Sequence, residues 1–128
     1  MAVTRSPVDH PNIVLLRGTL SSDPRCTTLP SGDELWSYEV TTRDADGRAE
    51  SVPVVLGSAR PLARAKAGDE VVVVGHVRRR FYRAGGRTAS RTEVVADRLI
   101  DARRRRSVDT AVAAATDRLH SLWGPDAP

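Results

Sequence analysis

Short apolar and β-branched runs, typical of β-strands, recur along most of the chain, and residues 34–43 alternate apolar and polar side chains with a period of two. Clusters of Gly, Pro, Asp and Ser separate the apolar runs, as turns do. One stretch, 107–123, repeats apolar residues at helical spacing, and a shorter helix is expected at 58–66, where Ser58 can cap the first turn. These runs and the turns between them predict strands at 12–20, 25–29, 34–43, 50–57, 70–80 and 91–100.

The most informative stretch is 68–100, in which two β-branched runs flank a basic arm. The arm turns at a Gly-Gly pair, 85–86, which indicates a β-hairpin. Six arginines and no acidic residue lie within 71–92, and the aromatic residues Phe81 and Tyr82 sit among them. An arm with this mixture favours a polyanion that carries flat rings, and single-stranded nucleic acid is the obvious example.

The predicted elements follow one another in a recognisable order. Five main strands come with a helix between the third and the fourth and a long hairpin between the last two. This order is typical of the OB-fold, a five-stranded, partly open Greek-key barrel that binds oligonucleotides on one face and with its loops. The predicted fold class is therefore all-β, with an extra C-terminal helix. Gly18, in the first strand, marks an expected bend of the barrel.

The chain divides into one folded unit with short flanking segments. At 128 residues it is long enough for one domain with a normal core. Ser107 is the expected N-cap of the last helix, which is too short to be stable alone and must dock on its own barrel or on the same helix of another subunit. The predicted segments are a flexible arm at 1–11, the barrel at 12–102, a basic linker at 103–106, the amphipathic helix at 107–123 and a tail at 124–128.

The net charge of +4 and the isoelectric point near 10.2 suggest an acidic partner but do not prove one. Lys66 is the only lysine, so nearly all of the positive charge is arginine. Arginine binds phosphate through two hydrogen bonds and stacks on bases, which suits nucleic acid. A GC-rich genome would also favour arginine codons, but it does not explain why arginines cluster in one arm.

Nothing in the sequence predicts catalysis. Cys26 is the only cysteine, so an internal disulfide is not expected, and the histidines do not stand at metal-ligand spacing from it. We therefore predict no catalytic residue, no metal site, no cofactor and no enzymatic activity. No apolar run approaches the roughly 18 residues of a membrane span, and 1–11 has no apolar signal core, so we expect a cytoplasmic protein.

Seven short motifs occur in order across 12–102. They are Asn12-x-Val14-x-Leu16-x-Gly18-x-Leu20, Asp23-Pro24, Pro30-Ser31-Gly32, Val54-Val55-Leu56-Gly57, Lys66-Ala67-Gly68-Asp69-Glu70-Val71, Gly75-His76-Val77-Arg78 and Thr92-Glu93-Val94-Val95-Ala96-Asp97. With this order and spacing, the sequence resembles the bacterial single-stranded DNA-binding protein family. The resemblance implies a non-enzymatic protein that wraps and protects single-stranded DNA in replication, repair and recombination. The implied partners are single-stranded DNA and other copies of the chain, as a tetramer or dimer, at the nucleoid.

The aromatic stacking platforms of that family are only partly matched. Tyr82 matches the platform of the long hairpin, whereas the second-strand platform falls near Asp46 and the third-strand platform at Glu50 or Ser51. Because stacking contributes about 1–3 kcal/mol per base, we expect weaker and more salt-dependent binding than is usual in the family. The acidic, aromatic C-terminal tip of the family is also missing, so recruitment of replication enzymes through it is not expected. This pattern fits a short or divergent paralogue of actinobacterial type.

The candidate nucleic-acid contacts are aromatic rings and arginines. Tyr82 is expected to stack on a base, while Phe81 points the opposite way along the strand and either packs or serves as a second stacker. Trp36 shares a face with Tyr38 and Val40, which favours core or subunit packing over stacking. The arginines expected to contact phosphates are Arg78, Arg80, Arg83, Arg87 and Arg91 in the arm, and Arg43 and Arg48, which flank the hairpin loop expected at 44–47.

Three function classes remain open. The first is sequence-nonspecific binding of single-stranded DNA, in which about four neutralised phosphates give a slope of log affinity against log salt of roughly −3. The second is an oligomeric barrel that acts as an interaction module with weak or no DNA affinity. The third is an RNA-binding or oligosaccharide-binding barrel, since the fold also serves those ligands.

Overall fold

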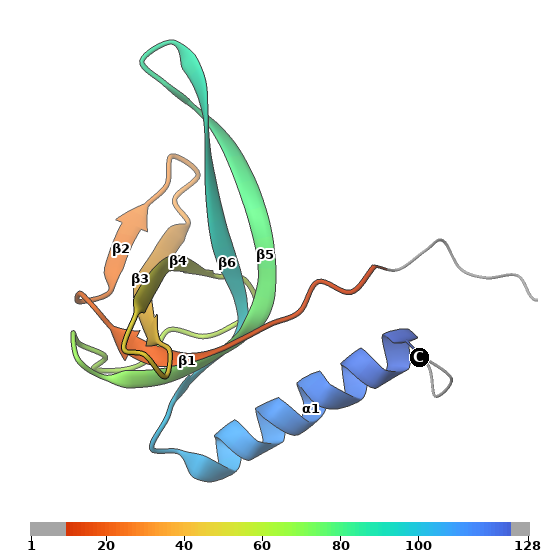
Figure 1. Cartoon of the computed structure of the whole chain (residues 1–128). Helices are drawn as coiled ribbons and strands as arrows, with labels where there is room; N and C mark the ends of the chain where they lie inside the picture. Colours follow the sequence, from red (N-terminus) through yellow and green to blue (C-terminus); the bar gives the residue numbers. More distant parts are fainter. Residues whose placement is uncertain (1–9, 124–128) are drawn as a thin grey trace, which may run out of the picture.

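The computed structural model describes residues 10–123, which form a small barrel with one helix beside it (Figure 1). Residues 1–9 of the predicted N-terminal arm and the predicted tail at 124–128 lie outside the described residues. The elements are β1 (Val14–Leu20), β2 (Arg25–Thr28), β3 (Glu34–Arg43), β4 (Ala49–Leu56), β5 (Glu70–Ala84), β6 (Arg87–Asp101) and α1 (Arg105–Trp123).

Five of the six described strands close into a barrel. They are hydrogen-bonded in the order β1-β5-β6-β4-β3, and β1 also pairs with β3, which completes the circle, while β2 extends the sheet at β3. The neighbours β4 and β6 are parallel, and the other pairs are antiparallel. A mostly-β chain with a closed five-stranded barrel and a C-terminal helix is consistent with an OB-like barrel, so the predicted class is confirmed at this level.

The barrel closes where β1 crosses from β5 to β3. Thr19 of β1 pairs with Glu70 on one side and with Thr41 on the other. The crossing needs a glycine at position 18, because a Cβ atom on Gly18 would overlap the carbonyl oxygen of Thr41. Gly18, where a bend was expected, therefore lies at a close approach of β1 to β3.

Apolar residues of all five barrel strands fill the interior. Val71 and Val73 of β5 point inward, whereas Val72 between them is buried on the opposite face. The run of valines thus reflects a strand that is covered on both faces. The buried interior cluster consists of Leu20, Tyr38, Val40, Val54, Val71, Val73, Val94, Ala96 and Leu99.

β5 and β6 continue beyond the barrel as a two-stranded arm (Figure 1). Their antiparallel pairing ends at Ala84 and Arg87, and Gly85 and Gly86 form the turn. Both glycines have positive φ, 57° and 77°, as a two-residue type I′ hairpin requires. The predicted hairpin is confirmed, and its strands are longer than the ranges 70–80 and 91–100.

The base of the arm has two irregular features. A β-bulge interrupts the register between Val74 and Gly75. The side chain of Asn12 then continues the pairing of β1 with β5: its Nδ2 donates to the carbonyl of Val77 at 2.9 Å, and the N–H of Val77 donates to its Oδ1 at 3.0 Å. A side-chain amide therefore takes the place of one more residue of β1.

The segment between β4 and β5 is a loop with turns, so the helix predicted at 58–66 is not formed. Arg64 has a φ of 60°, which lies outside the helical range. The N–H of Leu62 donates to the hydroxyl of Tyr38 at 3.4 Å instead of to a helical carbonyl. Tertiary hydrogen bonds therefore outweigh the local capping signal.

α1 begins at Arg105, two residues before the cap predicted at Ser107, so the linker predicted at 103–106 is partly helical. The turn before it is held by Asp101. The carboxylate of Asp101 accepts one hydrogen bond from the backbone N–H of Arg103, at 2.9 Å, and another from Nη2 of the Arg103 side chain, at 2.7 Å. This local pair directs the chain from the end of β6 into the helix.

α1 lies beside its own barrel, next to β5 and β6 (Figure 1). Ala111 is buried on the helix, and Val72 and Ile100 are buried on the two strands. Val108 and Leu119 of the apolar stripe are half-buried. Within one chain the helix thus has a docking surface, while pairing between subunits stays a hypothesis. The described part of the chain holds no helix whose length and apolar character would let it cross a membrane.

Candidate nucleic-acid interface

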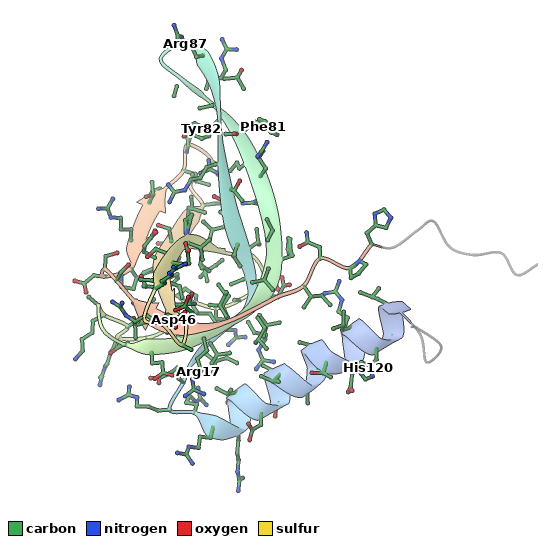
Figure 2. The ribbon with its side chains drawn as sticks, viewed as in Figure 1. Arg17, Asp46, Phe81, Tyr82, Arg87 and His120 are labelled. Atoms are coloured by element: carbon green, nitrogen blue, oxygen red, sulfur yellow. The ribbon has the colours of Figure 1, made fainter. Side chains whose placement is uncertain are left out.

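The β5–β6 arm has two faces, because consecutive residues of a strand point to opposite sides. Arg80 and Tyr82 lie on one face, and Phe81 lies on the other. Figure 2 shows Tyr82 and Phe81 on opposite sides of the arm and Arg87 at its tip. Cross-strand pairing adds Arg91, opposite Arg80, and Glu93, opposite Arg78. The Tyr82 face consists of Arg78, Arg80, Tyr82, Arg91 and Glu93.

Glu93 is almost fully buried, at 1% exposure, and it joins two of the candidate arginines. Its Oε2 accepts a hydrogen bond from Nη2 of Arg78 at 2.6 Å, and its Oε1 accepts one from Nε of Arg80 at 3.4 Å. A buried carboxylate needs such partners, since an unpaired charge is costly away from water. One carboxylate against two guanidinium groups leaves the cluster positive, and both arginine side chains remain more than 40% exposed.

Tyr82 and Arg80 form a cation–π pair on this face. The guanidinium carbon of Arg80 lies 5.3 Å from the centre of the Tyr82 ring, within the usual range for such contacts. Tyr82 is 40% exposed. Glu93 therefore holds Arg80, Arg80 lies over the ring, and the ring keeps open surface that a base could stack on.

Phe81 is 66% exposed, so it does not pack against the described part of the chain. Val77, four residues earlier and on the same face, is also exposed. Two roles were predicted for Phe81, and the structure contradicts one of them, packing within the barrel. Its ring is open to a partner on the face opposite Tyr82.

The other arginines of the arm have different surroundings. Nη2 of Arg83 donates to the carbonyl of Gly86 at 3.4 Å, so this residue supports the turn. Arg91 lines a cleft of about 270 Å³, together with Arg25 and Glu39 of the neighbouring β2 and β3. The cleft connects the Tyr82 face with the edge of the barrel.

Arg43 is the last residue of β3 and Arg48 lies in the loop that follows it, away from the arm. Figure 2 shows Asp46, in that loop, at the opposite end of the barrel from Arg87. Nη1 of Arg43 donates to the carbonyl of Gly47 at 3.3 Å, which closes the loop on itself. The structure thus does not bring these two arginines together with the Tyr82 face.

Trp36 and Arg17 are engaged in the barrel. Trp36 is half-buried and packs against the core cluster, so packing within the chain is what the structure shows for it. Arg17 of β1 forms an ion pair with Glu70 of β5. Neither residue adds to the Tyr82 face.

Glu93 is the residue of this face that sequence reasoning missed. It lies one residue beyond the basic stretch 71–92, at the start of an apolar run that predicts only a strand. The sequence does contain the information needed to find Glu93, because a hairpin centred on 85–86 places it directly across from Arg78.

No group of three His, Cys, Asp or Glu side chains within residues 10–123 is arranged to hold a metal ion. Cys26 is exposed, and desolvation by the surrounding protein followed by the nearby carboxylate of Glu34 raises the pKa of its thiol. A raised thiol pKa reduces the thiolate fraction and hence the reactivity of the sulfur.

A search of models of known protein families and of curated proteins finds no match for this chain. The resemblance to the single-stranded DNA-binding protein family therefore rests on the motifs of its sequence.

Proposed function

We propose that this protein binds single-stranded DNA without sequence preference, and that the strand lies along the Tyr82 face of the arm. The observation that carries the proposal is the chain of contacts from Glu93 through Arg80 to Tyr82, which offers an oriented cation beside a partly exposed ring. Stacking on the ring and pairing of guanidinium groups with phosphates are the two interactions that non-specific single-strand binders combine.

Each residue of the Tyr82 face has a role in this proposal. Tyr82 stacks on one base, and Arg80 adds its charge to the same step of the strand. Arg78 and Arg91 contact phosphates on either side, since their guanidinium groups form bidentate pairs with phosphate oxygens. Because few aromatics take part, electrostatic pairing dominates the affinity, which makes it salt-dependent.

The biological context is part of the same proposal. The motifs favour an OB-fold with Greek-key connections and membership of the bacterial single-stranded DNA-binding protein family. They also favour a homo-oligomer that acts in replication, repair or recombination in the cytoplasm.

The test is a titration of fluorescent oligo-dT at two salt concentrations. Tyr82→Ala should weaken binding roughly 5- to 150-fold, because one stacked base contributes about 1–3 kcal/mol. The matched control is Phe81→Ala, which removes a neighbouring ring from the opposite face and should change the affinity much less. Equal losses in both variants, or no binding at low salt, would contradict the proposal.

A second function, an oligomeric interaction module, is favoured by one observation. A groove of about 360 Å³ lies between the start of β1 and α1 and is lined by Ile13, Leu15, Ala115 and Leu119. Leu15 is 49% exposed, which is unusual for a leucine that serves only its own core. Light scattering of the wild type and Leu15→Ser tests this function. Loss of an oligomer in the variant supports it, and a monomeric wild type removes it.

An RNA-binding barrel is the alternative to a DNA-binding one. Ring stacking and phosphate pairing serve both nucleic acids, and a protein distinguishes them through the 2′-hydroxyl. Parallel titrations with oligo-dT and oligo-rU decide between them, since a preference of tenfold or more, about 1.4 kcal/mol, identifies the ligand.

A further inference from the structure

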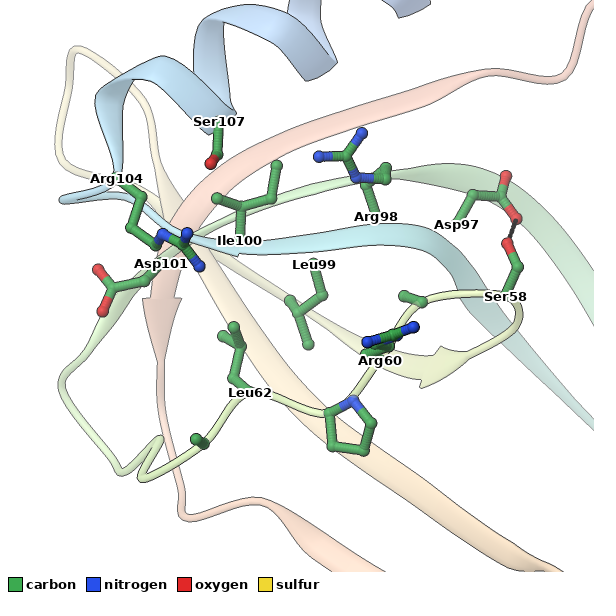
Figure 3. Close-up of a pocket in the computed structure, with 13 residues that line it drawn as sticks. Ser58, Arg60, Leu62, Asp97, Arg98, Leu99, Ile100, Asp101, Arg104 and Ser107 are labelled. Atoms are coloured by element: carbon green, nitrogen blue, oxygen red, sulfur yellow. Dashed lines mark hydrogen bonds between the residues drawn. The ribbon is translucent and has the colours of Figure 1, made fainter.

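A pocket of about 510 Å³ lies where the loop after β4, the C-terminal half of β6 and the turn that leads into α1 meet. Three arginines line it, each from a different one of these segments: Arg60, Arg98 and Arg104. Figure 3 shows their guanidinium groups around the apolar side chains of Leu99 and Ile100. We call it the Arg98 pocket.

The three guanidinium groups have no anionic partner within residues 10–123. None of them takes part in an ion pair or a side-chain hydrogen bond in that range. Three like charges around one pocket repel one another, and they are best accommodated when an anion joins them.

The two carboxylates at the rim already have partners. Asp101 is held by Arg103, whose Nη2 lies 2.7 Å from its Oδ2. Asp97 accepts a hydrogen bond from the hydroxyl of Ser58 at 3.4 Å, drawn as a dashed line in Figure 3, and its Oδ2 lies 3.6 Å from Nδ1 of His76. Three arginines against two carboxylates leave the lining of the pocket with a net positive charge.

The register of β5 and β6 places this pocket on the same face of the ribbon as Tyr82. Arg98 lies opposite Val74, and Val74, His76, Arg78, Arg80 and Tyr82 are alternate residues of β5. Alternate residues of a strand share a face. From Val74 to Tyr82 the strand advances about 26 Å, at about 3.3 Å per residue.

We propose that the Arg98 pocket binds backbone phosphates of the single strand after it has crossed the Tyr82 face. This inference rests on the proposed function and extends it from the arm to the base of α1. The chemistry recognised is a phosphate group, which arginine pairs with through two hydrogen bonds. A free phosphate compound carries the same group, so the test must separate the two sources.

The test compares two oligo-dT lengths in the full chain. Single-strand sites cover about 4–16 nucleotides per OB-fold, so an oligonucleotide of about 5 nucleotides occupies the Tyr82 face, and one of about 20 reaches the pocket. The variants are Arg98→Ala and the double variant Arg60→Ala/Arg98→Ala. The matched control is Arg118→Ala, which removes one exposed arginine of α1 that does not line the pocket.

We expect Arg98→Ala to weaken binding of the long oligonucleotide and to reduce its salt slope by about 0.7 for each phosphate that is no longer neutralised. The double variant should bind more weakly still, while the short oligonucleotide and the Arg118→Ala control should change little. Circular dichroism and thermal melting of each variant must match the wild type, which excludes misfolding as the cause.

Three other outcomes overturn the inference, and they differ from one another. If Tyr82→Ala weakens both lengths while the Arg98 variants weaken neither, the proposed function survives and the pocket has no part in it. If no oligonucleotide binds, the proposed function fails and this inference fails with it. If pyrophosphate shifts the NMR signal of Ser107 in the wild type but not in Arg98→Ala, and long oligo-dT is unaffected, the pocket takes free phosphate compounds instead of a strand.

Discussion

Arg78 and Glu93 face each other across the arm, with Nη2 of the arginine 2.6 Å from Oε2 of the glutamate. The glutamate is buried and the arginine is half-exposed, so the pair joins the interior of the ribbon to its surface. A guanidinium held at one edge by a carboxylate has a fixed direction, and its remaining N–H groups are free to donate hydrogen bonds at the surface.

Glu93→Ala should lower the free energy of unfolding by about 1–2 kcal/mol, because it removes two charge-assisted hydrogen bonds while the arginines, which are partly exposed, can still be solvated. Urea unfolding followed by circular dichroism measures the change. Glu50→Ala, which removes an exposed glutamate of β4, is the control and should stay within about 0.5 kcal/mol of the wild type. Equal stability of the two variants would show that the buried carboxylate contributes nothing.

Asp101→Asn should remove a pH-dependent part of the stability. Hydrogen bonds from the Arg103 side chain and then from its backbone N–H lower the pKa of Asp101 from 3.8 to about 2. A lowered folded-state pKa stabilises the protein above pH 3.8, and this stabilisation is lost as the pH falls toward 2. Because the pair is solvent-exposed, we expect only about 0.5–1 kcal/mol.

Thermal melting of wild type and Asp101→Asn at several pH values measures that difference. The wild type should be more stable at pH 7, and the two curves should meet at the acid end. Asp117→Asn, on the exposed side of α1, is the control and should follow the wild type throughout. A difference that is constant with pH would mean that the carboxylate charge is not its source.

Gly86→Val should disrupt the end of the arm without unfolding the barrel. The φ of Gly86 is 77°, and a left-handed conformation costs a side-chain-bearing residue about 1–2 kcal/mol, more when it is β-branched. Amide exchange near the turn should become faster and oligo-dT affinity should fall, while the melting temperature stays near that of the wild type. Gly85→Asn is the matched variant, because asparagine tolerates the φ of 57° at that position. Loss of affinity in both variants to the same degree would argue against a role for the turn geometry.

Sequence reasoning predicted the hairpin because its signals are local. Two β-branched runs and a Gly-Gly turn need no knowledge of the rest of the fold, and β5 and β6 form as expected. The strand ends were placed too close to the barrel, because arginine, threonine and serine near the turn carry no apolar alternation. Pairing with the neighbouring strand, which is not visible in one run of sequence, extends them to Ala84 and from Arg87.

The errors have tertiary causes. The expected helix at 58–66 had a cap and apolar residues, but Tyr38, distant in the chain, takes the N–H of Leu62. Arg43 and Arg48 flank a hairpin that the sequence predicts correctly, yet local pattern cannot show at which end of the barrel that hairpin lies. The same limit hid the Arg98 pocket, whose three arginines come from segments that only the folded chain brings together.

β5 is one uninterrupted strand of 15 residues, and its first part lies in the core while its last part forms the arm. No linker separates the arm from the part of β5 that lies in the core. A force on the tip of the arm passes along the main chain of β5 to Val71 and Val73, because the extra residue of the bulge, Asp97, lies on β6. The arm and the barrel share this strand, so a partner that pulls on the arm also applies force to the core residues of β5.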